Sequence, residues 1–219
     1  FVVDKPPFGG HQWQTEQPGG GSMDARAIPT IGYRGMHSFE ISFEDWRVPH
    51  SALIGEDEGL GRGFYLQMQA FSNARLQTAA RAQGVMQAAL DEAIDYSRSR
   101  QVFGRPLADH GLTRTKLARM VALLAACRAF AFEVARQLAR DDAGAQLAAS
   151  QVKQLACRVT EWTTREAQQL HGGYGYAEEY TVSRLFVDGR VLSIFEGADE
   201  VLALKVIARA ITSEALARL

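Results

Sequence analysis

The pattern of apolar and polar positions along the chain changes near residue 62. Before this point Phe39, Ile41 and Phe43 alternate with polar residues, and a period of two is typical of a half-buried β-strand. Beyond it apolar residues recur every three or four positions, as in Met86 and Leu90, which predicts amphipathic helices. We expect long helices at 62–98, 107–140 and 143–170, a short helix at 180–190 and a last helix at 199–217.

The helix breakers between these segments predict how the helices are connected. Gly104 and Pro106 separate the first two long helices, and a short turn from Asp141 to Gly144 separates the second from the third. Short connections place successive helices antiparallel, so residues 62–219 are expected to form an up-and-down helical bundle. The predicted fold class is mostly α, with the bundle preceded by a partial antiparallel β-domain at residues 1–61.

The first residues suggest a chain that begins within a fold. Phe1 takes the place of a starting methionine and is followed at once by strand-like Val2 and Val3. We expect the short β region to be unable to close a barrel and to leave strand edges unpaired. The chain is therefore interpreted as a truncated protein with a complete helical bundle.

Composition and charge exclude several classes of partner. The 219 residues include 24 basic and 25 acidic side chains, for a formal net charge of -1, so nothing provides the basic excess that nucleic acids or anionic membranes attract. The longest apolar run, Met120–Cys127, is far shorter than the roughly 20 residues of a membrane span. Cys127 and Cys157 lie in Ala-rich segments, which predicts buried free thiols and a cytoplasmic, reducing location.

Familiar catalytic motifs are missing from the sequence. It contains neither a Rossmann fingerprint nor a P-loop, and it has no Gly-x-Ser-x-Gly elbow for a nucleophilic serine. The five histidines show no metal-ligand spacing, so a zinc site has no support.

Two glycine-containing loops remain as candidates for a binding site. The Arg100–Leu107 loop offers an arginine that could grip a phosphate and an aromatic ring that could stack on a planar cofactor. The Gln169–Tyr176 loop could bring backbone N–H groups close to a phosphate. On composition alone, both loops are better explained as ordinary helix ends, so the two interpretations stay open.

Glu196 is the one acid whose position lacks an obvious structural role. Apolar or small residues precede it and Gly197 follows, so the carboxylate is expected in a turn with apolar flanks, where desolvation makes it a stronger base. The structural alternative is an acid that satisfies N–H groups at the start of a helix. Asp199 and Glu200 already fill that role in the sequence.

Together these segments resemble the flavin-dependent acyl-CoA dehydrogenases, over essentially the whole chain. Phe43–Pro49 is similar to the exit of the family's middle β-domain, and Arg100–Gly104 is similar to its Arg-x-x-Phe-Gly corner. Gln169–Tyr176 resembles its Gly-Gly-x-Gly-Tyr loop, and Phe195–Gly197 resembles its catalytic Glu-Gly turn. The resemblance covers the end of the middle β-domain and the C-terminal helical domain.

The resemblance implies a reaction and a set of site residues. Glu196 would remove the α-proton of an acyl-CoA thioester while the β-hydrogen leaves as hydride to FAD, and the product would be the enoyl-CoA. The groups implied to hold the FAD diphosphate and adenine across a subunit interface are Arg100, Phe103, Gln169 and Gly173, and those beside the flavin of their own subunit are Ala198 and Glu200. Arg75 and Gly197 are implied at the substrate pocket.

Some positions depart from the family pattern. The alternative place for the base, used by some members, is occupied here by Ala74, which cannot act as one. Ala198 replaces the usual threonine after Glu-Gly, and Gly111 stands where many members have glutamine. These changes predict altered flavin affinity and an intact base.

The expected function is that of an FAD-dependent acyl-CoA dehydrogenase of fatty acid metabolism. The implied partners are an acyl-CoA substrate, an electron-transfer flavoprotein and further copies of the chain, as a dimer or homotetramer. Two alternatives stay open: an acyl-CoA oxidase, and a non-catalytic subunit that completes another subunit's flavin site. A DNA-binding relative is disfavoured because the chain lacks a basic excess.

Overall fold

The computed structural model describes the backbone of residues 1–217, and the side chains of these residues except Gln69, Ser72 and residues 214–217. Residues 218 and 219, the last two of the predicted bundle domain, lie outside the described part. Contacts divide the chain into two compact units, residues 1–69 and 70–219. The domain boundary expected between residues 61 and 62 stays a prediction.

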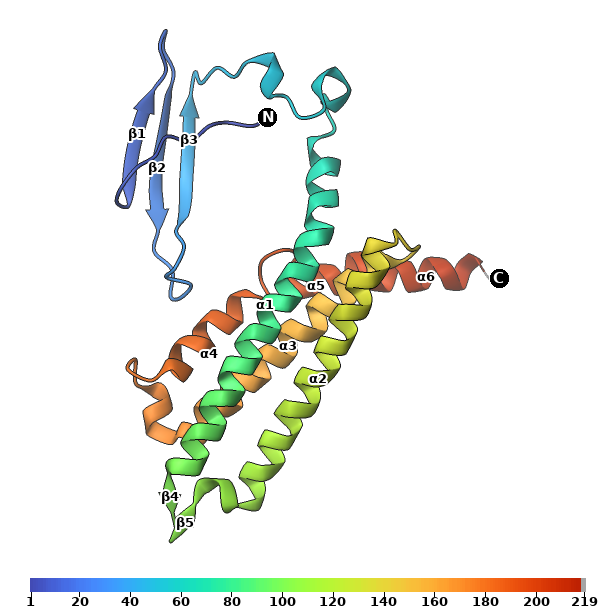
Figure 1. The fold of residues 1–219 in the computed structure, drawn as a ribbon. Coiled ribbons are helices and arrows are strands. Elements are labelled where there is room, and N and C mark those ends of the chain that lie inside the picture. Colours follow the sequence, from blue (N-terminus) through green and yellow to red (C-terminus); the bar gives the residue numbers. More distant parts are fainter. Residues whose placement is uncertain (218–219) are drawn as a thin grey trace. The chain divides into compact units, whose positions relative to one another are not determined.

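The first unit contains a small antiparallel sheet. Its strands are β1 (Gln12–Glu16), β2 (Ser22–Ile28) and β3 (Ser38–Glu44), hydrogen-bonded in that order (Figure 1). Trp13, Met23 and Ala25 form its buried cluster, against which Phe8 and Phe39 pack. 3₁₀-helical turns follow at His50–Ala52 and Glu56–Gly59.

The strand predicted around Phe39 is confirmed as β3, but its apolar face is covered at one end only. Phe8 contacts the Phe39 ring, with 5.2 Å between ring centroids. Ile41 and Phe43, on the same face, are 40% and 53% exposed. The alternating pattern gave the direction of the side chains correctly, whereas burial depends on a covering layer that the pattern does not contain.

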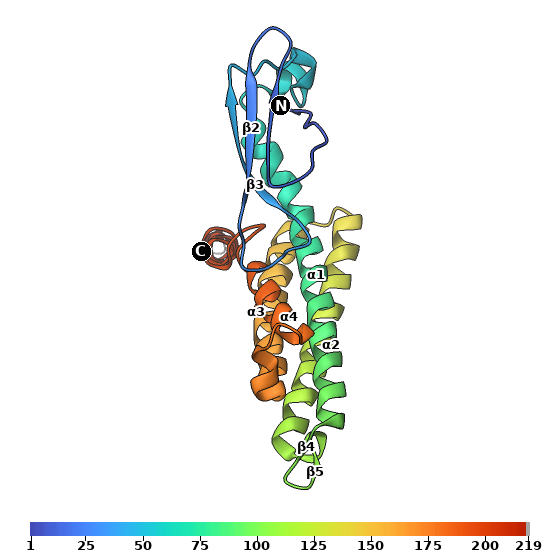
Figure 2. The same ribbon diagram turned by 90° about the vertical axis from the view of Figure 1, so that its left-hand side faces the viewer.

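Long helices dominate the second unit. They are α1 (Gly63–Ser99, which begins in the first unit), α2 (Gly111–Ala139), α3 (Ala145–His171) and α4 (Thr181–Val191). Figure 1 shows neighbouring helices running in alternate directions, and Figure 2 shows α1, α2 and α3 still side by side after a 90° turn. The predicted up-and-down bundle, preceded by a small antiparallel sheet, is confirmed.

Shorter elements connect and finish the bundle. Between α1 and α2 lie β4 (Gln101–Val102), β5 (Arg105–Pro106) and a 3₁₀ turn at Leu107–Asp109. After α3 comes a 3₁₀ segment at Gly172–Tyr176. The chain then forms α5 (Asp199–Val201), a π-helical stretch (Leu202–Ile207) and α6 (Ala208–Ala217). Helix α2 begins at Gly111, later than the predicted residue 107, because Leu107–Asp109 form a 3₁₀ turn before it.

The bundle core is built largely from alanine, valine and leucine, with two methionines. Met86, Met120 and Val152 are fully or almost fully buried, and small alanines let the helices approach closely. The Thr160 hydroxyl donates to the Ala82 carbonyl at 3.1 Å and so links α3 to α1. Cys127 and Cys157 are free and buried, as predicted. In the described part of the chain, none of the helices is long and apolar enough to cross a membrane.

Candidate functional site

Glu196 lies at the tip of a closed turn between α4 and α5. The Asp199 N–H donates to the Ser193 carbonyl at 3.1 Å and closes the loop. Glu196 has φ +56° and Gly197 has φ +102°. A non-glycine residue in the left-handed region costs roughly 1–2 kcal/mol, and such strain concentrates at functional sites.

Glycine is required after Glu196. A Cβ atom on Gly197 would lie 2.9 Å from Cδ2 of Leu202, whose side chain is almost fully buried. The positive φ of Gly197 is also unfavourable for any other residue. Space and backbone conformation therefore both fix the Glu-Gly pair.

The Glu196 carboxylate interacts electrostatically with Arg75 of α1. Oε2 of Glu196 and Nε of Arg75 are both buried, and neither has a hydrogen-bond partner among the described residues. The Arg75 side chain is oriented by Nη1, which donates to the Ser150 hydroxyl at 3.1 Å. Burial lowers the pKa of Arg75, and the negative charge of Glu196 opposes that shift. A carboxylate and a guanidinium, each with one buried polar atom that lacks a hydrogen-bond partner, thus lie in the same partly buried region.

Helix α3 contacts this turn through a buried lysine that the sequence analysis missed. Lys153 is 0% exposed and its Nζ donates to the Gly197 carbonyl at 2.8 Å. Nζ also lies 3.4 Å from Oδ1 of Asp199, whose Oδ2 accepts from Nε of Arg158 at 3.0 Å. A signal was present in the sequence: Lys153 is spaced three or four residues from the buried Ala149 and Ala156, on the inner face of α3.

Asp199 lies in the first turn of α5, as expected, and its side chain has a further role that the sequence did not reveal. It is almost fully buried between Lys153 and Arg158. A lysine far away in sequence is a stronger partner for this carboxylate than exposed backbone N–H groups.

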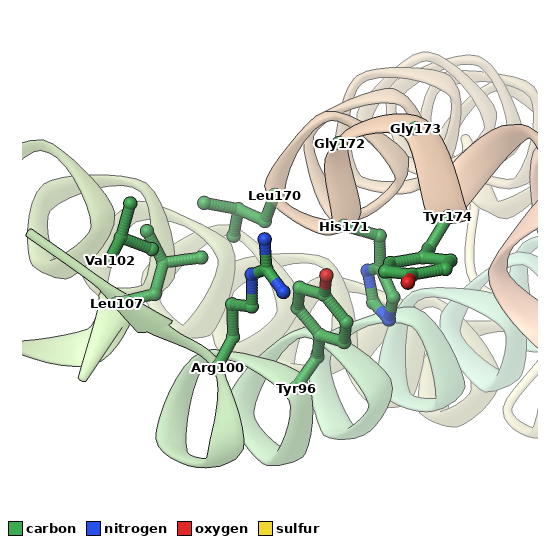
Figure 3. A pocket seen from close by; sticks show the side chains of 9 residues that line it. All are labelled: Tyr96, Arg100, Val102, Leu107, Leu170, His171, Gly172, Gly173 and Tyr174. Atoms are coloured by element: carbon green, nitrogen blue, oxygen red, sulfur yellow. The ribbon is translucent and has the colours of Figure 1, made fainter.

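The two glycine-containing loops line the same cavity, at the opposite end of α3. Its volume is about 440 Å³. It is lined by Tyr96, Arg100, Val102, Leu107, Leu170, His171, Gly172, Gly173 and Tyr174. In Figure 3 the Arg100 side chain extends from the end of α1 toward Leu170. The structure thus brings together Arg100 and Gly173, which are far apart in sequence.

Two aromatic side chains that line this cavity, Tyr96 and His171, are held in place by stacking. The rings of Tyr96 and His171 are stacked with their centroids 4.2 Å apart. Nδ1 of the buried His171 lies 2.8 Å from the Ala167 carbonyl, which fixes the orientation of the imidazole. Figure 3 shows the Tyr96 ring beside the Arg100 guanidinium and the His171 ring on the other side of Tyr96.

Other residues expected at the cofactor lie outside this cavity. Phe103 is 93% exposed at the tip of the β4–β5 hairpin, and Gln169 is exposed near the end of α3. Ala198 and Glu200 line a different cavity of about 310 Å³, together with Arg158 and Ser193. The structure therefore separates the expected cofactor residues: Arg100 and Gly173 lie at the C-terminal end of α3, whereas Ala198 and Glu200 lie beside its middle, near Arg158.

The Arg100 cavity fits the phosphate end of a dinucleotide. Within the described residues, no carboxylate lies within ion-pair distance of the Arg100 guanidinium, so it is available to an anion. A Cβ placed on Gly172 or Gly173 would meet nothing within 4 Å, so a ligand can approach their backbone closely. The described residues contain no cluster of ligands for a metal ion.

Comparison with known proteins identifies the family to which this architecture is similar. A family model described as "Acyl-CoA dehydrogenase, C-terminal domain" matches residues 61–212. The (2S)-methylsuccinyl-CoA dehydrogenase of Cereibacter sphaeroides is 41% identical over 189 residues, which are 85% of this chain and 33% of that protein. The cyclohexane-1-carbonyl-CoA dehydrogenase of Syntrophus aciditrophicus is 36% identical over 184 residues, 84% of this chain and 47% of that protein.

A solved structure agrees with these sequence matches. Butyryl-CoA dehydrogenase from Megasphaera elsdenii superimposes with a TM-score of 0.77 and 28% identity, over 92% of this chain and 55% of that one. The bundle and the sheet before it thus define an acyl-CoA dehydrogenase-like fold. The chain belongs to the acyl-CoA dehydrogenase family, whose members use FAD. It spans about a third to a half of the length of these relatives.

Proposed function

We propose that this chain supplies the catalytic base and part of the flavin site of an FAD-dependent acyl-CoA dehydrogenase. Glu196 accepts the α-proton of the acyl-CoA thioester, and the electron pair of that C–H bond forms the Cα–Cβ double bond. FAD, when bound, supplies the acceptor for the hydride that leaves Cβ. The carrying observation is the buried, unpartnered Oε2 of Glu196 on a strained, closed turn.

The surroundings of Glu196 support this role. The α-proton of a thioester is weakly acidic, so its removal requires a desolvated carboxylate and donors that stabilise negative charge on the thioester oxygen. Among the described residues the Glu196 N–H has no acceptor, so it is available as such a donor. Arg75 and Gly197 complete the proposed substrate side: Arg75 places a positive charge near the carboxylate, and Gly197 permits the turn.

The separation of the cofactor residues favours a site shared between copies of the chain. Lys153, beneath the Glu196 turn, and Gly172, at the other cavity, lie nineteen residues apart, roughly 28 Å along the axis of α3. Ala198 and Glu200 would contact the flavin of their own chain. Arg100, Phe103, Gln169 and Gly173 would hold the nucleotide end of a cofactor bound to a partner copy, in a dimer or homotetramer. The exposed Phe103 ring supports this assignment, because an aromatic ring at a hairpin tip gains burial only from a partner or ligand.

Electron acceptor and cellular location are part of the same proposal. We infer a cytoplasmic enzyme of acyl-CoA or fatty acid metabolism that passes electrons to an electron-transfer flavoprotein, and its two buried free thiols fit a reducing compartment. An acyl-CoA oxidase is the alternative, and hydrogen peroxide formed stoichiometrically with product under air would favour it. A non-catalytic partner subunit would bind flavin only after mixing with a second chain.

The test is Glu196→Gln in the protein expressed from its whole gene. Flavin reduction is measured with butyryl-CoA, methylsuccinyl-CoA and cyclohexane-1-carbonyl-CoA, which sample straight, branched and ring-bearing acyl groups. We expect flavin absorbance per chain to be unchanged and turnover to fall roughly 10²- to 10⁴-fold, because the amide cannot accept the proton. Glu133→Gln, an exposed change on α2, is the control and should match the unmutated protein. Turnover retained by Glu196→Gln would rule out this base.

A further inference from the structure

The ammonium group beneath the Glu196 turn is unusual in its burial. Lys153 is 0% exposed, although lysine is almost never fully buried unless it is paired. Its strongest contact is with backbone, since Nζ lies 2.8 Å from the Gly197 carbonyl and 3.4 Å from the Asp199 carboxylate. The charge is therefore directed at the peptide group that follows Glu196 and Gly197.

The charges around Lys153 are balanced by a second cation. Asp199 lies between Lys153 and Arg158, and accepts from Nε of Arg158 at 3.0 Å. A buried ion pair of this kind contributes little net stability, because desolvation of the charges offsets their attraction. Its function is therefore better sought in the geometry that it imposes on the turn.

Neighbouring side chains of α3 fix both ends of the same turn. Nε2 of Gln154 donates to the Asp199 carbonyl at 3.0 Å, and Sγ of Cys157 donates to the Leu192 carbonyl at 3.2 Å. The Asp199 N–H closes the loop on Ser193. One face of α3 thus contacts the start, the middle and the end of a segment whose tip carries Glu196.

We propose that Lys153 is a positioning residue for the proposed base. By holding the Gly197 carbonyl, it fixes the left-handed conformation of the Glu-Gly pair and aims the Glu196 carboxylate at the substrate carbon. This inference rests on the proposed function of Glu196. A displacement of about 1 Å at a reacting group can cost on the order of 100-fold in rate, so the anchor affects catalysis without contacting substrate.

The experiment compares Lys153→Met with the double variant Lys153→Met/Asp199→Asn, in the flavin-loaded protein expressed from its whole gene. The probe is whichever of the three thioesters named above the unmutated protein oxidises with the highest kcat/KM. For Lys153→Met we expect kcat to fall roughly 10- to 100-fold, with KM within about twofold and flavin content unchanged. The double variant removes the buried charge imbalance, so its Tm should recover while its kcat stays low.

If the ion pair had a purely structural role, kcat would recover together with Tm in the double variant. Recovery of Tm alone therefore supports a positioning role. Lys116→Met is the matched control: it breaks the partly buried pair with Glu166, thirteen residues beyond Lys153 on α3 and roughly 20 Å along its axis. This control should lower Tm and leave kcat unchanged.

Three results would overturn the proposal: a kcat for Lys153→Met within twofold of the unmutated protein, recovery of kcat together with Tm in the double variant, or loss of folding in both variants. The Glu196→Gln result separates the two hypotheses. Turnover retained by that variant rejects the base itself, whereas an inactive Glu196→Gln with a normal Lys153→Met rejects the positioning role alone.

Discussion

The Glu196 turn and the Phe103 corner share a backbone conformation and differ in everything around it. Phe103 and Gly104 have φ +53° and +79°, close to the values of Glu196 and Gly197, +56° and +102°. The corner joins paired strands β4 and β5, as expected of a two-residue hairpin with both central residues left-handed. The turn joins α4 to α5 and is held by side chains of α3.

The difference shows what the local conformation does not determine. A hairpin tip is stabilised by its own strands and projects Phe103 into solvent, where another molecule can reach it. The Glu196 turn has no paired strands beside it, so its strained conformation depends on contacts from α3. A binding group benefits from access, whereas a proton acceptor benefits from a fixed position.

The largest expected effect is a loss of stability when a methyl group is added to Gly197 of the turn, compared with the same change at Gly104 of the corner. Gly197→Ala places a Cβ 2.9 Å from Leu202, so we expect a loss of about 2–4 kcal/mol in the free energy of unfolding from overpacking and backbone strain. Gly104→Ala meets open space and should lose only about 1 kcal/mol. Urea unfolding of both variants measures the difference, and equal losses would mean that the surroundings of the turn are looser than described.

A smaller effect, on FAD affinity, is expected at the Arg100 cavity beside the C-terminal end of α3. Arg100→Gln should weaken FAD binding roughly 10-fold, because a charged donor to the diphosphate is lost from the cavity. Titration of the apoprotein with FAD, followed by flavin fluorescence, measures the affinity. Arg105→Gln, on the hairpin that follows Arg100 and outside the cavity lining, is the control. If both changes had the same effect, general charge rather than this cavity would attract the cofactor.

The smallest effect concerns the thiol beneath the turn. Burial raises the pKa of Cys157 to about 12, so the folded thiol stays neutral while the thiol of the unfolded chain ionises near pH 8.5–9. The folded state therefore binds the proton more tightly, and stability contributed by Cys157 is lost as pH rises through this interval. Between pH 7 and pH 9.5 the unmutated protein should lose about 1 kcal/mol more than Cys157→Ala. Unfolding curves at both pH values test this, and parallel losses would contradict a closed environment.

Sequence patterns predicted the parts of the fold that depend on neighbours along the chain. Helical periodicity located α1, α3 and α4 to within a few residues, and the Ala-rich flanks of Cys127 and Cys157 indicated buried thiols correctly. The start of α2 was predicted too early, because Leu107–Asp109 form a separate 3₁₀ turn before the helix. Exposure of Ile41 and Phe43 was not predictable, since alternation indicates which face a side chain occupies and not what covers it.

In the candidate site, too, features that depend on sequence neighbours were predicted, and contacts between distant residues were not. Glu196 stood out because its immediate neighbours are apolar and leave it without a structural partner. The link between Lys153 and Asp199 spans forty-six residues, and a single lysine in an alanine-rich helix is usually assigned to the surface. Arg100 and Gly173 were expected at one ligand and do line one cavity, whereas Phe103 and Gln169 lie outside it.

The position of α3 between the two functional segments limits where residues can be inserted into the chain. It carries Lys153 near one functional segment and ends at His171 beside the other. Inserting a single residue between them would move the far end by about 1.5 Å and rotate it by about 100°. Arg100, which is fixed to α1, would then face a different side of the Gly172–Tyr174 loop. The number of residues in this stretch of α3 is therefore set by geometry, and an insertion or deletion there is incompatible with the present arrangement of the two functional segments.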